Sequence, residues 1–187
     1  MITSEKLHSY MAAGIDNAHW YEASRDSAAR WCKANDVDLN TFLSVVAILS
    51  PRVQVVRNIR LAKQWVMEDK NPSGIMGQRV RALEIFHGSG KVSGTKINAF
   101  RDSLMLKPGA VCIDIHMSRI FGFDGGELMS ETKKYRTLRE KSQRIVRRLA
   151  HRYGMTSYGV QACLWCGYLK TEKGYSADRF GPMDFSD

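Results

Sequence analysis

The sequence of 187 residues contains no long apolar run. Nothing in it approaches the roughly 18 consecutive apolar residues that a membrane-spanning helix needs. At the N-terminus, no apolar segment follows a basic one, as it would in a secretory signal peptide. These absences argue against a membrane anchor and against secretion. We therefore expect a cytoplasmic protein with no membrane partner.

Cysteine and proline are also scarce, with four of each. Cys163 and Cys166 form the only Cys-x-x-Cys pair, while Cys32 and Cys112 stand alone. An iron–sulfur cluster is usually held by four closely spaced cysteines, and this spacing is absent. The pair lies in an apolar helical stretch, which favours core thiols over a metal site. We expect neither a metal nor another cofactor.

Regular strand alternation is a third absence. Apolar residues instead recur at helical intervals through most of the chain, so the sequence predicts an all-α fold. Beyond residue 170 the tail is expected either to wrap the surface or to be disordered. Helices are predicted within 5–34, over 38–49, 52–68 and 78–86, from Lys96, from Asp114, and over 132–153 and 155–169.

Positive charge is what the sequence has in excess. Lysine and arginine number 28 against 19 acidic residues, which gives a formal net charge of +9. Such a surplus points to DNA or another polyanion as partner, although a basic protein without such a partner would share this composition. The length and the 44% hydrophobic content suit one compact domain, or two small lobes that share a core.

The predicted helix over 132–153 concentrates this charge. Its apolar residues form only a narrow stripe, so one face should pack while the basic remainder stays exposed. Two roles fit the basic face: a solvated surface, or one wall of a DNA path. For the second role we single out Arg136, Arg139 and Arg144.

The stretch from Gly94 to Gly122 carries the residues with chemistry. Lys96 follows Gly94 at a helix start, where a tight turn leaves backbone N–H groups free for an anion. Eighteen residues further on, Asp114 ends an apolar run and opens the motif Asp114-x-His116-x-x-Arg119. The apolar residues that follow let this second helix bury one side while the carboxylate stays at its N-terminus.

This stretch resembles the helix-hairpin-helix DNA glycosylase superfamily, in which a Gly-x-Lys turn precedes Val-Asp-x-His at about this interval. Gly94-Thr95-Lys96 and Asp114-Ile115-His116-Met117 are similar to the pattern of the 8-oxoguanine DNA glycosylases. Upstream, Ile48-Leu49-Ser50-Pro51-Arg52 resembles the Leu-Leu-Ser-Ala-Gln turn of endonuclease III relatives.

The resemblance implies a monomeric DNA glycosylase with a two-lobed helical fold around a central DNA-binding cleft. One lobe would span about residues 36–112, and the other would combine residues 1–35 with 113–187 in the same domain. Lys96 would be the amine nucleophile that attacks C1′ and passes through a Schiff base, which also permits strand cleavage by β-elimination. Asp114 would stabilise the positive charge that builds on the sugar.

The resemblance also implies a set of DNA contacts. Arg52 would fill the gap that a flipped-out base leaves in the duplex. Trp20 and Tyr21 fit either the core or a pocket that stacks on the extruded base. His116 suits a structural or phosphate-contacting role better than that of a base. The other expected contacts to DNA are Gly94, Thr95 and Arg119.

The chain departs from the superfamily at the hairpin, where Gly90-Lys91-Val92-Ser93-Gly94 stands in place of Leu-Pro-Gly-Val-Gly. Two other functions therefore stay open. One is a phage-type enzyme that uses the same fold to build hypermodified DNA bases instead of removing damaged ones. The other is a non-catalytic DNA-binding module in which Lys96 contacts phosphate and nothing is cleaved.

Overall fold

The computed structural model describes residues 2–51, 53–68, 70–124, 127–176 and 179–186. Within these ranges the chain forms helices and no strand, which confirms the predicted all-α class. None of the helices seen there is both long and apolar enough to cross a bilayer. The α-helices are α1 (Ser4–Ala13), α2 (Trp20–Ala34), α3 (Leu39–Leu49), α4 (Val55–Glu68), α5 (Gly77–Ser89), α6 (Thr95–Leu104), α7 (Ile115–Ile120), α8 (Lys133–Tyr153) and α9 (Ser157–Lys173), and the 3₁₀ helices are η1 (Ile15–Asn17) and η2 (Glu127–Met129).

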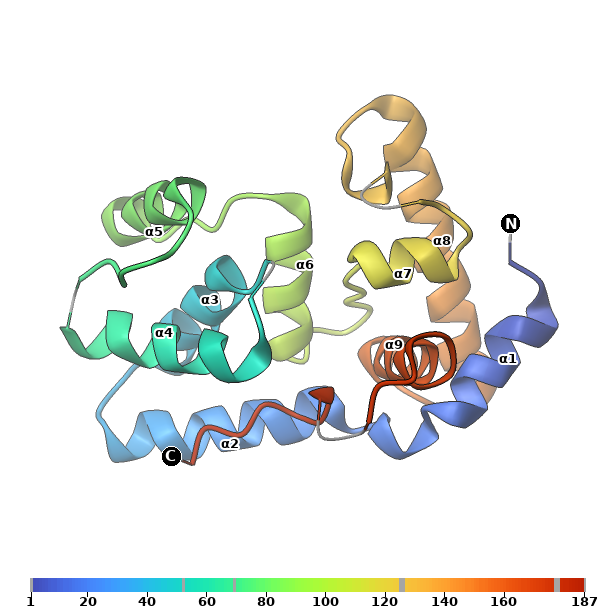
Figure 1. Cartoon of the computed structure of the whole chain (residues 1–187), viewed down its shortest axis with the longest axis horizontal. Coiled ribbons are helices and arrows are strands. Elements are labelled where there is room, and N and C mark those ends of the chain that lie inside the picture. The colour runs from blue at the N-terminus through green and yellow to red at the C-terminus, as the bar shows by residue number, and fades with distance from the viewer. Residues whose placement is uncertain (1, 52, 69, 125–126, 177–178, 187) are drawn as a thin grey trace.

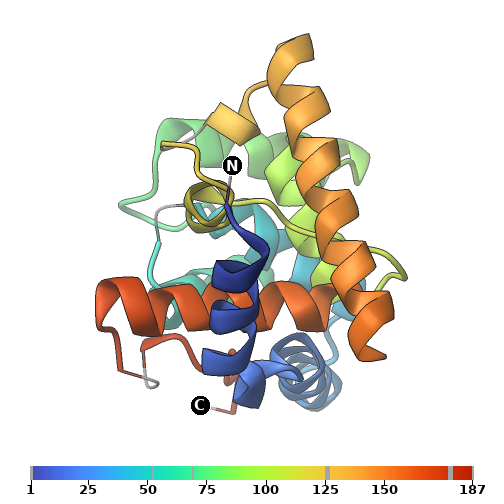
Figure 2. The ribbon, with the colours of Figure 1, turned by 90° about the vertical axis from the view of Figure 1, so that its right-hand side faces the viewer.

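The helices gather in two groups (Figure 1). One group holds α3, α4, α5 and α6, and the other holds α1, α7, α8 and α9. The α2 helix packs against α3 and α6 of the first group and against α9 of the second. Figure 2 shows α8 and α9 crossing, with α1 in front of α9. Where the two groups meet, α6 of the first group faces α7 of the second (Figure 1).

The first group is built around α3. All eight residues from Phe42 to Leu49 are buried, because α2, α4, α5 and α6 surround this helix. The side chain of Asp38 accepts the Thr41 N–H at 2.7 Å and so caps the N-terminus of α3. Pro51 follows the helix. The next helix, α4, begins at Val55, three residues later than its predicted start at position 52.

The second group is held together by a very close approach of α1 and α9. A Cβ added to Gly167 would lie 2.0 Å from the Tyr10 carbonyl oxygen, and one added to Gly14 would lie 2.0 Å from that of Cys163. Only glycine fits at these two contacts. Cys163 and Cys166 are buried and free on the same helix, as expected of core thiols.

The C-terminal tail is packed over residues 179–186. The side chains of Phe180, Met183 and Phe185 are all buried. The backbone N–H of Met183 donates to Ser24 Oγ at 2.9 Å, and that of Phe185 donates to Ser27 Oγ at 2.8 Å. Of the two alternatives for the tail, wrapping is therefore the one observed, and the tail runs along α2 (Figure 1).

Candidate active site

A cavity of about 840 Å³ is lined by residues from both groups of helices. Lys96, near the start of α6, and Asp114, just before α7, both line it. The two residues that carry the predicted chemistry are thus brought to one cavity. Trp20 and Tyr21 of α2 line it as well.

The backbone and two side chains set the position of Lys96. Gly94 caps α6 with φ of 94°, a left-handed value that favours glycine, and the helix then begins at Thr95. The Lys96 Nζ donates to Ser50 Oγ at 2.9 Å and lies 5.2 Å from the centroid of the Phe100 ring. A cation over an aromatic face is a favourable contact. The amine is therefore held between a hydroxyl and a ring at the cavity wall.

Both carboxylate oxygens of Asp114 accept hydrogen bonds. Oδ1 accepts the Met117 N–H at 2.8 Å, which makes Asp114 the N-cap of α7, as predicted. Oδ2 accepts the indole Nε1–H of Trp165 at 3.1 Å. Trp165 lies on α9, 51 residues away in the sequence. The carboxylate is half-buried and held from two directions while it lines the cavity.

Three other titratable groups of the cavity stay neutral near pH 7. Burial raises the pKa of the Cys112 thiol to about 12, even though the charge of Lys96 lowers it. Burial likewise raises the pKa of Tyr21 well above its usual value. The pKa of His116 is lowered, mainly by burial, while Asp114 opposes this shift. Since a nucleophilic cysteine must be a thiolate, Cys112 is unsuited to that role.

Four aromatic side chains are among the residues that line the cavity. Trp20 and Tyr21 are only 6% and 3% exposed, and their ring centroids lie 4.9 Å apart in an edge-to-face contact. Both therefore belong to the core and line the cavity at once. Phe100 and Trp165 also line it. Neither of these two residues stands in a sequence motif, so no sequence signal indicated their place in the cavity.

Glu131 and Thr95 meet beside Lys96. The Thr95 hydroxyl donates to Glu131 Oε1, and this bond is the main cause that lowers the pKa of Glu131. Arg139 contacts the same carboxylate at 3.4 Å. Its guanidinium also donates to the carbonyl oxygens of Leu128 and Ser130, at 3.0 and 3.1 Å. With 7% exposure, Arg139 is buried and holds the loop before α8, so the expectation that this basic side chain is exposed is wrong.

A family model matches residues 9–172 of the chain. The chain belongs to the family of unknown function DUF7178. The match to DUF7178 includes Lys96 and Asp114 and ends before the tail that packs along α2. No curated protein and no solved structure matches the chain.

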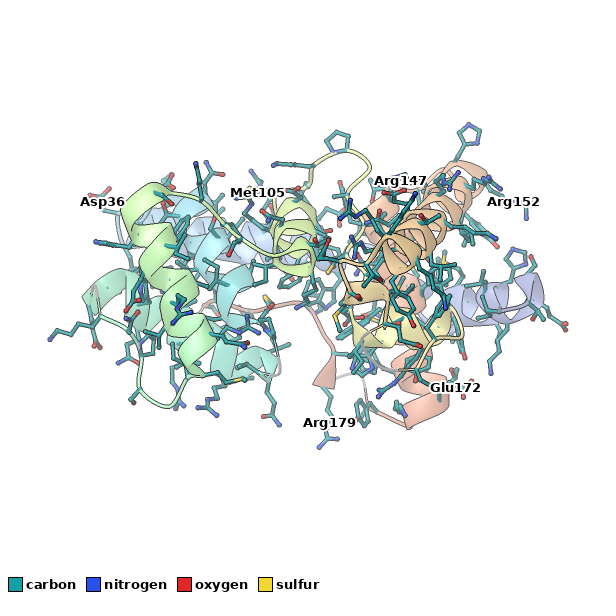
Figure 3. All side chains as sticks on the ribbon, turned by 90° about the horizontal axis from the view of Figure 1, so that it is seen from above. Asp36, Met105, Arg147, Arg152, Glu172 and Arg179 are labelled. Carbon is teal, nitrogen blue, oxygen red and sulfur yellow. The ribbon has the colours of Figure 1, made fainter. Side chains whose placement is uncertain are left out.

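The remaining predicted DNA contacts lie in several places. Arg119, Arg136 and Arg144 are exposed, whereas His116 is half-buried and lines the cavity with Gly94 and Thr95. Arg147 and Arg152, on the same helix as Arg136 and Arg144, are exposed too (Figure 3). Arg52 lies outside the described residues. Among those that are described, no group of three or more His, Cys, Asp or Glu side chains is placed to hold a metal ion.

Proposed function

We propose that this protein is a DNA glycosylase that excises a damaged or modified base and then cuts the strand through a lysine Schiff base. The observation that carries the proposal is that Lys96 and Asp114 line the same cavity, together with aromatic rings. In this proposal the two groups of helices are the lobes of a helix-hairpin-helix glycosylase-like fold, with duplex DNA bound along the cleft between them.

The chemistry assigned to Lys96 begins with the neutral amine. Its lone pair forms a bond to C1′ while the N-glycosidic bond breaks, and the base leaves with the bonding electrons and takes a proton from water. The attached nitrogen loses one proton to water, and its lone pair then forms a C=N bond to C1′ while the C1′–O4′ bond breaks and O4′ takes a proton, which gives a Schiff base. Water takes a proton from C2′, the electrons of that bond form a C2′=C3′ double bond, and the C3′–O bond breaks. The phosphate leaves with the bonding electrons, which cuts the strand.

Asp114 has a separate task in this reaction. Positive charge builds on the sugar as the glycosidic bond breaks, and a fixed carboxylate stabilises that charge. The two hydrogen bonds to its oxygens hold Asp114 in one orientation. Charge stabilisation of this kind depends on groups that are already oriented before the reaction begins.

The cavity suits an extruded base. A base within a duplex cannot be reached by an enzyme, so it must be flipped into a pocket and stacked against apolar or aromatic side chains. The rings of Trp20, Tyr21, Phe100 and Trp165 offer such walls. The net charge of +9 favours the approach of the duplex.

The test uses duplexes that carry a panel of damaged and modified bases, with release of free base measured in single turnover. Borohydride added during turnover should trap a covalent protein–DNA adduct. Lys96→Gln should abolish both the adduct and strand cleavage while leaving duplex affinity nearly unchanged. Asp114→Asn should slow base release but still allow Lys96 to react with a pre-formed abasic site.

Lys33→Gln serves as the matched control, because Lys33 is exposed at the end of α2 and does not line the cavity. This variant should retain the adduct and the wild-type rate. Undiminished base release by Lys96→Gln, with no adduct in the wild type, would refute the lysine mechanism. Duplex binding without release of any base in the panel would instead favour the non-catalytic module.

A further inference from the structure

Two residues of α9 contact the short segment that places Asp114. Gln161 and Trp165 are one helical turn apart and both line the cavity. Gln161 bonds to the backbone of Cys112, and Trp165 bonds to the side chain of Asp114. One face of α9 thus bonds the chain at two places, the backbone of Cys112 and the carboxylate of Asp114.

Gln161 is buried, with 5% exposure, and both ends of its carboxamide are engaged. Its Oε1 accepts the Cys112 N–H at 3.0 Å, and its Nε2 donates to the Tyr21 hydroxyl at 2.8 Å. A backbone N–H can only donate, so the oxygen of the amide must face Cys112. The side chain therefore has one orientation, and it ties α2 and α9 to the chain two residues before Asp114.

Trp165 restrains the carboxylate itself. An N-cap carboxylate held through one oxygen can still rotate about its last side-chain bond, and a second donor on the other oxygen prevents this rotation. The indole is in turn positioned by neighbouring rings, with centroid distances of 6.4 Å to Trp20 and 6.2 Å to His116. Hence the direction of the Asp114 carboxylate depends on how α9 packs.

We propose that Gln161 and Trp165 are positioning residues that fix the Asp114 carboxylate relative to the sugar of the substrate. This inference rests on the proposed function, in which Asp114 stabilises the charge on that sugar. Neither side chain needs to touch the reacting atoms. A misplacement of about 1 Å at a reacting centre can cost about 100-fold in rate, so the loss of a positioning contact should appear in the chemical step.

The kinetic test is a double-mutant cycle between Trp165→Phe and Asp114→Asn. Phenylalanine keeps an aromatic ring but removes the N–H donor. Trp165→Phe alone should slow single-turnover base release about 10- to 100-fold with unchanged duplex affinity. In the Asp114→Asn background the same change should have little further effect, because the carboxylate that it positions is gone. Gln161→Met should slow base release in the same way.

A second measurement does not depend on activity. The indole N–H resonance of Trp165, assigned from its absence in Trp165→Phe, should lie downfield and exchange slowly with solvent in the wild type. Asp114→Ala should shift it upfield and speed its exchange. The indole resonance of Trp65 serves as the control, because Trp65 is buried in α4 and does not line the cavity. It should stay unchanged.

The outcomes separate this inference from the proposed function. Wild-type base release by Trp165→Phe, alongside a slow Asp114→Asn, would overturn the positioning role and leave the proposed function intact. An indole resonance that does not respond to Asp114→Ala would overturn it too. If Asp114→Asn itself releases base at the wild-type rate, the charge-stabilising role of Asp114 fails, and the positioning role fails with it even where the resonance shifts. If the wild type releases no base from any duplex of the panel, the proposed function itself fails.

Discussion

The side-chain nitrogen of Lys96 lies 2.9 Å from the hydroxyl oxygen of Ser50, which directly follows α3. The Ser50 hydroxyl donates its own hydrogen to the Ala47 carbonyl oxygen at 2.9 Å. It can therefore only accept from Lys96, and the two hydrogen bonds connect the end of α3 to the amine. These bonds hold the amine at the cavity wall without placing a charge beside it.

Ser50→Ala should loosen Lys96 while leaving the fold intact. We expect borohydride trapping to slow about 5- to 20-fold, since the hydrogen bond that positions the amine is lost. The free energy of unfolding should change by less than about 1 kcal/mol. Ser44→Ala is the control within α3 itself, because Ser44 also bonds a backbone carbonyl, at 2.7 Å, but does not line the cavity. Equal trapping rates in both variants would remove the role of Ser50.

Glu131→Gln should strengthen duplex binding. In the proposed function Gly94 and Thr95 meet a DNA phosphate, and the Glu131 carboxylate already bonds the Thr95 hydroxyl there. Removing its negative charge should raise affinity about two- to fivefold at low salt, with a smaller gain at high salt. Glu5→Gln, an equal charge change at the exposed start of α1, should give no such gain. Unchanged affinity in Glu131→Gln would place the phosphates elsewhere.

Arg136 and Arg144 should act on DNA binding, and Arg139 on stability. The double change of Arg136 and Arg144 to Glu should weaken duplex binding for all sequences. It should also make the slope of log affinity against log salt concentration shallower by about two. The control changes Arg30 and Lys33 to Glu, which alters the net charge equally on exposed positions of α2. Arg139→Glu should instead destabilise the fold, because it removes a buried donor to two carbonyls.

Gly167→Ala should destabilise the protein strongly. The added Cβ would lie 2.0 Å from a backbone oxygen of α1, and backbone cannot move aside as a flexible side chain can. We expect a loss of about 2–4 kcal/mol in urea unfolding. Gly88→Ala is the control, since no atom lies within 4 Å of its added Cβ and alanine favours the helix. Similar stabilities for the two variants would contradict the close approach of α1 and α9.

Alkaline pH should weaken the fold through Cys112. The folded state raises the pKa of this thiol from 9.0 to about 12, mainly by burial. Between these values the unfolded chain has lost a proton that the folded chain keeps, so stability falls as pH rises, by up to about 1.4 kcal/mol per pH unit. Measured by urea unfolding, the free energy of unfolding should fall less between pH 8 and pH 10.5 in Cys112→Ala than in the wild type. An identical fall in both proteins would exclude Cys112 as a source.

The sequence was most informative where the deciding contacts are local. Helix periodicity predicted the all-α class, and the start of α7 at Asp114 followed from a cap whose partner, Met117, lies three residues away. Gly94 before Lys96 is a similar case, because the backbone angle needed there favours glycine. Such signals lie within one turn of helix and are readable without the fold.

The sequence did not reveal which partners these residues meet across the fold. Lys96 and Ser50 are 46 residues apart, and Asp114 and Trp165 are 51 residues apart, so no local pattern joins either pair. Arg139 stands in a basic helix like its neighbours, and only the loop folded against it makes it buried. The sequence by itself determined the helices and placed Lys96 and Asp114 at the starts of two of them. Tertiary packing alone decided which side chains surround those groups, because burial and long-range hydrogen bonds depend on how distant helices meet.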